Sequence, residues 1–258
     1  MPDRPVTAPA PNDADPRPSS ALVPKKPLLM RFGKWVQPRI NALIARSSRV
    51  GDRPVYDTRE FPWVARLEEN WEVIEEEVAA VLGDLERIPP LATISPDHRR
   101  IAPPRKWRSF FLIGYRYRAE ENCRRCPRTT ELVSGIPGLN SAFFSILEPG
   151  THIPLHTGVT KLIMTCHLGI RVPREADKCW MDVAGQVLNW QAGRAIVFDD
   201  TFIHEVRNDT AETRVVLLIQ FRRPAGPLGR LVGSLFLEGV RRSRFVQDAR
   251  RGVRDWKG

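Results

Sequence analysis

The fold of this chain is decided by two stretches, Glu148-Pro-Gly-Thr-His-Ile-Pro-Leu-His-Thr-Gly158 and Ile196-Val-Phe-Asp-Asp-Thr-Phe-Ile-His-Glu-Val206. Each combines turn residues with a short β-type segment and places a histidine, His156 or His204, in apolar surroundings. Four of the five histidines in the chain fall between residues 152 and 204. Because neutral imidazole is the commonest protein ligand for iron, copper and zinc, we interpret His156 and His204 as a metal-binding pair.

Short β-type segments separated by Gly and Pro turns surround this pair. We expect strands over residues 107–117, 141–147, 161–172, 179–183, 186–190, 194–198, 204–207 and 213–221. His152 and His156 both point inward if the segment between them is a regular strand, but Pro154 argues against one. The pattern indicates a mainly β fold with flanking helices, a jelly roll of the cupin type whose barrel mouth holds the metal ligands.

The flanking regions divide the chain into four parts. Residues 1–27 are rich in Pro and predict a disordered tail. Residues 28–55 form a basic amphipathic segment, and residues 225–258 a basic amphipathic C-terminal helix. The catalytic domain is expected over residues 56–224, with its β core at about 107–224. Within it, residues 58–88 have the periodicity of a single helix, and residues 129–134 that of a short one.

The net charge of +10 is concentrated at the two ends of the chain. Residues 1–55 carry 10 Lys or Arg against 4 Asp, and residues 225–258 carry 8 against 3 Asp or Glu, which leaves residues 56–224 with a net charge of −1. The basic residues are not interleaved with a recognisable nucleic-acid-binding fold, so we expect no nucleic-acid partner. Two readings stay open for the ends: peripheral contact with an anionic membrane, or packing on the domain with the charges in water.

The compartment follows from what the sequence lacks. It has no secretory leader and no run of about 18 apolar residues that could cross a membrane, so we expect a cytoplasmic protein, peripheral on the inner face of the membrane if it binds one. Four cysteines are then reduced thiols. Cys123-Arg-Arg-Cys126 has no second ligand pair and is interpreted as two ordinary thiols rather than a zinc site.

Arg214 stands at the head of the very apolar segment Val215-Val-Leu-Leu-Ile219. An arginine buried there without a partner would be costly. A carboxylate that accepts two hydrogen bonds from the guanidinium is the natural counterion. We therefore expect Arg214 to bind an acid.

Several separated motifs now occur in order: Ser145, His156-Thr-Gly158, His167-Leu-Gly169, Phe198-Asp-Asp-Thr-Phe-Ile-His204 and Arg214. Together they resemble the aspartyl/asparaginyl β-hydroxylase family over roughly residues 107–224. The resemblance implies a double-stranded β-helix and an Fe(II)- and 2-oxoglutarate-dependent dioxygenase. Such an enzyme converts 2-oxoglutarate and O2 to succinate and CO2 while it hydroxylates an unactivated C–H bond.

The same resemblance assigns roles to individual residues. His156 and His204 would bind the iron, and Ser145, His167 and Arg214 would bind 2-oxoglutarate. Gly158 stands where many 2-oxoglutarate enzymes have a third, carboxylate ligand; the peptide-hydroxylating branch also has Gly there, and water fills the position. Asp199 and Asp200 would then orient His204 or that water.

The substrate stays open between three alternatives. The family default is an aspartyl or asparaginyl residue, or a free amino acid. Ile163 and Thr165, however, replace two arginines that bind the cosubstrate and the acidic substrate in the peptide hydroxylases, and only Lys161 offers a nearby positive charge. Bacterial relatives that hydroxylate an acyl chain of lipid A or ornithine lipid suggest a lipid substrate. A cupin-like protein that binds a metal or a small acid without turnover is the third.

Overall fold

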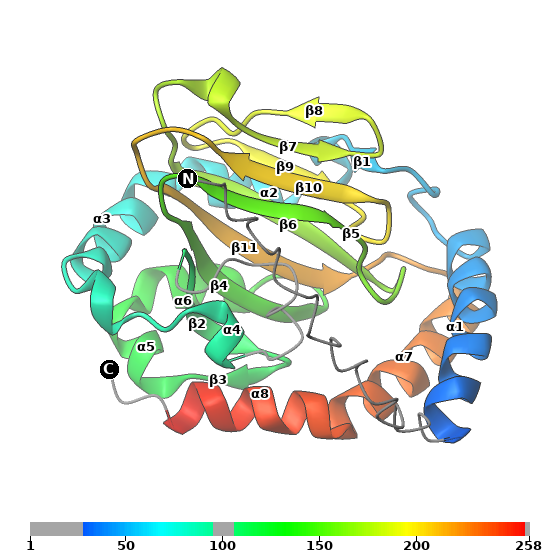
Figure 1. The fold of residues 1–258 in the computed structure, drawn as a ribbon. Coiled ribbons are helices and arrows are strands. Elements are labelled where there is room, and N and C mark those ends of the chain that lie inside the picture. The colour runs from blue at the N-terminus through cyan, green and yellow to red at the C-terminus, as the bar shows by residue number, and fades with distance from the viewer. Residues whose placement is uncertain (1–27, 95–105, 256–258) are drawn as a thin grey trace, which may run out of the picture. The chain divides into compact units, whose positions relative to one another are not determined.

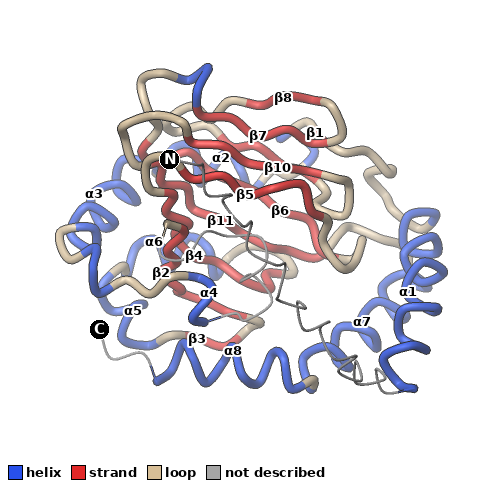
Figure 2. Tube along the Cα trace, in the orientation of Figure 1, coloured by secondary structure: helices blue, strands red, loops and turns tan. Residues whose placement is uncertain are grey.

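The structure is a computed structural model that describes residues 28–94 and 106–255. The tail expected to be disordered, residues 1–27, lies outside the described residues. The chain divides into two compact units, residues 1–36 and residues 37–258. The second unit contains all of the described strands, and Figure 2 shows that these strands lie at its centre with helices at their edges.

The described strands form two sheets (Figure 1). The larger sheet has seven strands in the order β1-β9-β6-β11-β4-β2-β3, and the smaller has four in the order β5-β10-β7-β8. Their bounds are β1 Val55–Tyr56, β2 Trp107–Gly114, β3 Tyr117–Arg118, β4 Leu139–Leu147, β5 Thr151–His156, β6 Ile163–Arg171, β7 Cys179–Val183, β8 Gln186–Leu188, β9 Ala195–Phe198, β10 His204–Asn208 and β11 Arg214–Arg222. All pairings are antiparallel. The two sheets form the expected jelly roll.

Helices precede, interrupt and follow the strands. The α-helices are α1 Leu28–Arg46, α2 Trp63–Glu69, α3 Trp71–Leu82, α4 Leu91–Ile94, α5 Glu120–Arg125, α6 Pro127–Ser134, α7 Pro227–Arg242 and α8 Arg244–Asp255. Short 3-10 turns lie at η1 Thr58–Glu60, η2 Leu85–Arg87 and η4 Ala176–Lys178. The prediction of a mainly β fold with flanking helices is confirmed.

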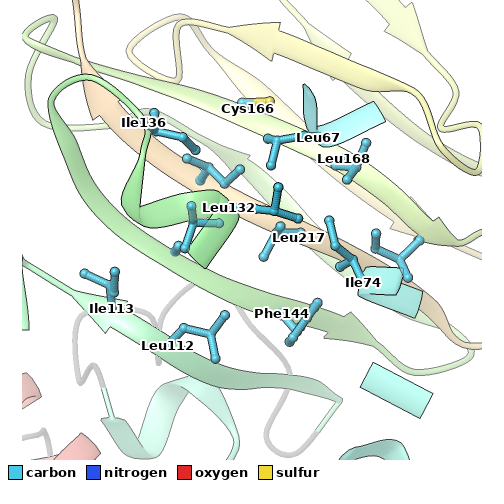
Figure 3. Packing of buried hydrophobic residues seen from close by; sticks show 14 of the residues in the cluster. Leu67, Ile74, Leu112, Ile113, Leu132, Ile136, Phe144, Cys166, Leu168 and Leu217 are labelled. Atoms are coloured by element: carbon cyan, nitrogen blue, oxygen red, sulfur yellow. The ribbon is translucent and has the colours of Figure 1, made fainter. Parts of the chain in front are cut away.

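One hydrophobic core lies between the larger sheet and the helices. Side chains alternate between the two faces of a strand, so Leu217 and Ile219 of β11 point to the helix side. There they meet Leu67 of α2, Ile74 of α3 and Leu132 of α6 (Figure 3). This core holds the larger sheet rigidly from behind and leaves its other face for the site.

A second core lies between the two sheets. Val216 and Leu218 of β11 point into it from the larger sheet, and Met181 and Val206 point into it from the smaller one. Arg214 lies on the same face of β11 as Val216 and Leu218 because the side-chain period of a strand is two residues. The inner side of the jelly roll is therefore mainly apolar, with a few polar side chains such as that of Arg214.

Three predicted elements have other bounds in the structure. The single helix over residues 58–88 is split into η1, α2, α3 and η2, because Pro62 opens α2 and the backbone leaves the helical region at Asn70. The strand over residues 107–117 ends at Gly114, because Tyr115 and Arg116 have positive φ angles of 49° and 69° and turn the chain into β3. The predicted C-terminal helix is likewise two helices, separated at Ser243.

A substitution at Gly169 tests the packing around β6. A Cβ atom at this position would lie 2.2 Å from the backbone oxygen of Gln191, so the backbone would have to shift. Gly169→Ala should therefore lower the free energy of unfolding by about 1–3 kcal/mol, as overpacking does in other cores. Gly239→Ala in α7 is the control, because its Cβ would meet nothing within 4 Å and alanine favours a helix. Equal stability of the two variants in urea unfolding would contradict this account.

Candidate active site

The two histidines lie opposite each other on neighbouring strands of the smaller sheet. His204 begins β10 and pairs with His156, which ends β5. Their ring centroids are 4.0 Å apart, with an angle of 50° between the ring planes. The pairing of β5 with β10 thus brings together two histidines that are distant in the sequence.

A β-bulge decides which histidine of β5 faces inward. The register between β5 and β10 shifts between His204 and Val206, so that Val206 pairs with Ile153 while His204 pairs with His156. The extra residue lets Ile153 and His156 both line the inner cavity. His152 instead bonds Glu205 at 2.8 Å, and Pro154 lies in the bulge, where proline is tolerated in a sheet.

Backbone carbonyls orient both rings. Nδ1 of His156 lies 2.8 Å from the carbonyl oxygen of Pro154, and Nδ1 of His204 lies 2.9 Å from that of Phe202. A carbonyl only accepts, so each Nδ1 carries the proton and donates it. The Nε2 lone pair of each ring is therefore free to bind a metal, the arrangement usual for metal-bound histidine.

Burial keeps these imidazoles neutral. It lowers the pKa of His204 to about 4, aided by repulsion from His156, and it lowers the pKa of His156 as well. The pKa of His167 is well below its ordinary value, because the ring is buried and lies near the positive charge of Arg214. Neutral rings at physiological pH are the form in which histidine binds metals.

Arg214 is buried without a counterion. Its side chain is 1 % exposed, and no carboxylate of the described residues lies within ion-pair distance. Its guanidinium stacks over Trp190 at 4.6 Å, Nη1 makes one long bond of 3.4 Å to the carbonyl oxygen of Ser145, and Nε has no partner. Burial lowers its pKa to about 10, so the guanidinium is still charged at neutral pH. A buried charge in this state requires an anion.

A cavity of about 140 Å³ joins these groups. The structure places all five residues predicted for the site on its wall: Ser145, His156, His167, His204 and Arg214. Among the described residues, the buried Nδ1 of His167 and Nε1 of Trp190 lack a hydrogen-bond partner, as does Nε of Arg214. Unpaired buried polar groups around a cavity point to a polar ligand.

The two aspartates that precede His204 have different environments. Asp199 is fully buried outside the cavity, where it binds Arg223 and, at 3.0 Å, Lys161. It also accepts bonds from the backbone nitrogen and hydroxyl of Thr201, and so holds the turn that leads to His204. Asp200 lines the cavity instead. The sequence predicts that Asp199 and Asp200 orient His204 or a bound water, and of the two only Asp200 lines the cavity.

Asp200 fills the space beside Gly158. A Cβ atom at residue 158 would lie 2.2 Å from Oδ1 of Asp200, and the backbone nitrogen of Gly158 donates to the carbonyl oxygen of Asp200 at 2.6 Å. A side chain at 158 is therefore excluded by packing. Within the described residues, no group of three or more His, Cys, Asp or Glu side chains has metal-binding geometry, so a metal here would have two protein ligands.

Ile163 and Thr165 stand where the peptide hydroxylases are expected to have arginines, and only one of the two lines the cavity. Thr165 lines the cavity and donates to Asp200 at 3.3 Å, whereas Ile163 is buried and does not line it. Lys161 is bound to Asp52 and Asp199 and so is not available as a replacement. Among the described residues that line the cavity, Arg214 is the only Lys or Arg that could bind an acidic side chain.

Two tryptophans of the site were not predicted. Trp107 donates from Nε1 to the hydroxyl of Ser145 at 3.0 Å, and Trp190 stacks on Arg214. Alternation along the strand beginning at residue 107 is a signal that could have found Trp107, since Trp107 and Phe111 share the inner face. Trp190 follows β8 in a turn, and no pattern in the sequence identifies it.

The histidine pair can be tested with a matched histidine of the same sheet. His204→Ala should abolish binding of Co(II), used as a stable substitute for Fe(II), because one of two ligands is lost. His152→Ala should leave binding within about twofold, because His152 bonds Glu205 outside the cavity. Absorption titration of the metal-free proteins measures both. Equal loss in the two variants would rule out the assignment.

The carboxyl group of Asp200 should make stability depend on pH. Burial and the negative charge of Asp199 raise the pKa of Asp200 to about 7. In the unfolded chain it ionises near pH 4, so between about pH 4 and 7 only the folded state retains the proton, and its contribution to stability falls as the pH rises.

Urea unfolding of the metal-free protein against Asp200→Asn measures this effect. The free energy of unfolding of wild type minus that of the variant should decrease by about 2–4 kcal/mol from pH 4 to pH 7. Contributions of the histidines cancel in this difference. A constant difference over the window would show that Asp200 ionises normally.

Comparison with known proteins gives a consistent set of similarities. The sequence pattern of the family described as Aspartyl/Asparaginyl beta-hydroxylase matches residues 68–224. An ornithine lipid ester-linked acyl 2-hydroxylase of Rhizobium tropici is 34 % identical over 265 residues, which cover 100 % of this chain and 94 % of that protein.

More distant similarities cover smaller parts. The human aspartyl/asparaginyl beta-hydroxylase is 30 % identical over 166 residues, 62 % of this chain but only 21 % of the human protein. Among solved structures, a Pseudomonas putida prolyl-4-hydroxylase aligns with 63 % of this chain and 100 % of its own, with 15 % identity and a TM-score of 0.39.

Proposed function

Because the chain belongs to the aspartyl/asparaginyl β-hydroxylase family, we propose that it is an Fe(II)- and 2-oxoglutarate-dependent hydroxylase of a lipid acyl chain. One observation carries the proposal. A pair of imidazoles whose Nδ1 atoms bond backbone carbonyls, and a buried arginine with no carboxylate partner among the described residues, line the same cavity. A protein that only stored a metal would have no use for the buried guanidinium.

The residues fit the iron and its cosubstrate. His156 and His204 would hold the metal; burial keeps both rings neutral, and the Nδ1 bonds fix their orientation. Arg214 would bind a carboxylate of 2-oxoglutarate, with Ser145 and the orphaned Nδ1 of His167 as further polar contacts. When bound, iron and 2-oxoglutarate would supply the oxidation of a C–H bond to C–OH by O2, in which 2-oxoglutarate becomes succinate and CO2.

The protein's own side chains supply orientation and a dry environment. Gly158 supplies no third metal ligand, and Asp200 is the polar group nearest to it. Near pH 7 the carboxyl group of Asp200 can accept or donate a hydrogen bond there. Phe198 packs edge-on against His167 and His204 and separates them from solvent. Exclusion of water strengthens the electrostatic contacts to the cosubstrate.

A lipid substrate is supported by the cavity wall. Beside its polar residues, the wall includes the apolar side chains of Phe111, Phe143, Met181 and Leu218. These side chains suit an acyl chain, whereas an acidic substrate would compete with the cosubstrate for Arg214, the only Lys or Arg among the described lining residues. The rhizobial acyl hydroxylase, moreover, is similar over the full length of this chain.

Hydroxylation of an aspartyl or asparaginyl residue is the second candidate. Its support is Gly158, which the resemblance associates with the peptide-hydroxylating branch, and the 30 % identity to the human aspartyl/asparaginyl beta-hydroxylase. The buried Ile163 and the pairing of Lys161 with Asp199 argue against it.

A lipid substrate also places the protein at a membrane surface. Within the described ranges, no helix has the length and apolar character to cross a bilayer. We propose peripheral contact with the inner face of an anionic membrane, mediated by basic amphipathic helices, and no nucleic-acid partner.

The cosubstrate assignment can be tested without knowing the substrate. With Fe(II), 2-oxoglutarate and O2, the protein should form succinate slowly in the absence of substrate. Arg214→Gln should weaken 2-oxoglutarate binding by about 30-fold or more, because it removes one partner of a buried charge pair. Arg174→Gln, at a 92 % exposed side chain, is the control. Calorimetric titration with Mn(II) in place of iron measures affinity; unchanged affinity in Arg214→Gln would refute the assignment.

The substrate is tested with purified ornithine lipid and with an aspartyl-containing peptide. We expect a product heavier by one oxygen atom from the lipid acyl chain and none from the peptide, measured by mass spectrometry. A hydroxylated peptide with unchanged lipid would replace the lipid proposal with the second candidate.

A further inference from the structure

A second cavity, of about 170 Å³, lies at the end of β11 away from Arg214. It is lined by residues distant in sequence: Arg49, Leu162, Arg222, Arg223, Pro224, Ala225, Arg230 and Ser234. None of these residues lines the histidine cavity. Its wall contains four arginines and no acidic residue.

Three of these arginines lack a counterion. Arg223 is neutralised by the buried Asp199, but Arg49, Arg222 and Arg230 have no carboxylate within ion-pair distance among the residues that the structure describes. Arg222 is half-buried and donates from Nη1 to the hydroxyl of Ser234 at 3.2 Å. Its pKa is lowered by burial and by the positive charge of Arg116. Clustered cations of this kind are stabilised by an anion.

The chemistry of the cavity matches a phosphate group. Guanidinium groups bind phosphate oxygens through paired hydrogen bonds, and the Ser234 hydroxyl adds a further donor. Helix α7 begins beside the cavity: Ala225, just before the helix, and Arg230, in its first turn, line the wall. The positive end of a helix dipole favours an anion. The volume exceeds that of one water molecule, about 30 Å³, several times.

Helix α7 presents an apolar face beside the same cavity. Leu228, Leu231 and Leu235 are 58 %, 60 % and 68 % exposed and lie on one side of the helix, at spacings of three and four residues. The buried Gly229 and Gly233 lie on another side of the helix, where a Cβ would collide with Ser47 or Leu162. This close contact fixes α7, and the exposed leucines lie on the side of the helix away from the two glycines.

We propose that this cavity, bounded by Arg49, Arg222, Arg230 and Ser234, binds the phosphate group of an anionic lipid while the three exposed leucines enter the acyl boundary beside it. Exposed apolar residues next to phosphate-binding arginines suit a membrane interface and not a free ion in water. The inference goes beyond the proposed function, because it assigns a second ligand at a site separate from the histidine cavity.

Flotation with vesicles tests the proposal. Vesicles of phosphatidylcholine with one quarter phosphatidylglycerol should bind the full-length protein, and vesicles of phosphatidylcholine alone should bind it much less. The double variant Arg222→Gln with Arg230→Gln should bind the anionic vesicles roughly 10- to 30-fold more weakly, given the usual contribution of each basic residue at a lipid surface. Leu231→Ser with Leu235→Ser should also weaken binding.

The control has the same change in net charge at another surface. Arg174→Gln with Arg194→Gln removes two arginines whose side chains are 92 % and 70 % exposed, and it should bind the vesicles within about twofold of wild type. Equal loss in both double variants would mean unspecific attraction and would overturn the proposal. So would saturable binding of inorganic phosphate that Arg222→Gln abolishes while vesicle binding stays intact.

A separate assay distinguishes this inference from the proposed function. In detergent solution, where no membrane surface exists, Arg222→Gln with Arg230→Gln should hydroxylate lipid at the wild-type rate, because both residues lie outside the histidine cavity. Loss of vesicle binding together with this unchanged rate supports the membrane site. Absence of hydroxylation even in the wild type would refute the proposed function and leave the vesicle result to decide the inference alone.

Discussion

The pairing of β5 with β10 is the constraint on which the site depends. It sets His156 opposite His204, and the bulge at Pro154 turns His156 to the same inner face as Ile153. The carbonyl oxygens of Pro154 and Phe202 then fix each ring in the tautomer that leaves Nε2 free. Loss of the bulge would reverse the facing of every residue on one side of it, since the side-chain period of a strand is two.

Buried charge organises the rest of the barrel in two ways. Asp199 and Arg223 neutralise each other outside the cavity, and this ion pair holds the turn that delivers His204. Among the described residues Arg214 has no carboxylate partner, and Trp190 and a long bond to Ser145 support it. The first arrangement is complete within the protein, whereas the second calls for an anion. This contrast separates residues that position the site from those proposed to bind the cosubstrate.

Much of the fold could be predicted, because strand patterns and turn residues are local properties. The short β-type segments at residues 141–147 and 213–221, bounded by turn residues, predicted strands that the structure contains as β4 and β11. Prediction failed at Asn70 and at Tyr115, where a change of backbone conformation at one residue ended an element whose apolar pattern continued. Periodicity reports which face is apolar, and it is insensitive to a single residue that breaks the backbone hydrogen-bond pattern.

The sequence by itself determined the jelly roll, the family and the choice of the five residues that line the inner cavity. It could do so because motifs such as His156-Thr-Gly158, taken in order, are specific to the family. Only the tertiary structure decided which histidine of β5 turns inward, which of two adjacent aspartates lines the cavity, and that Trp190 covers Arg214. It alone assembled the arginine cavity from residues near 49, 222 and 230. Side-chain direction at a bulge, and contact between distant segments, arise from packing in three dimensions and have no local signal in the chain.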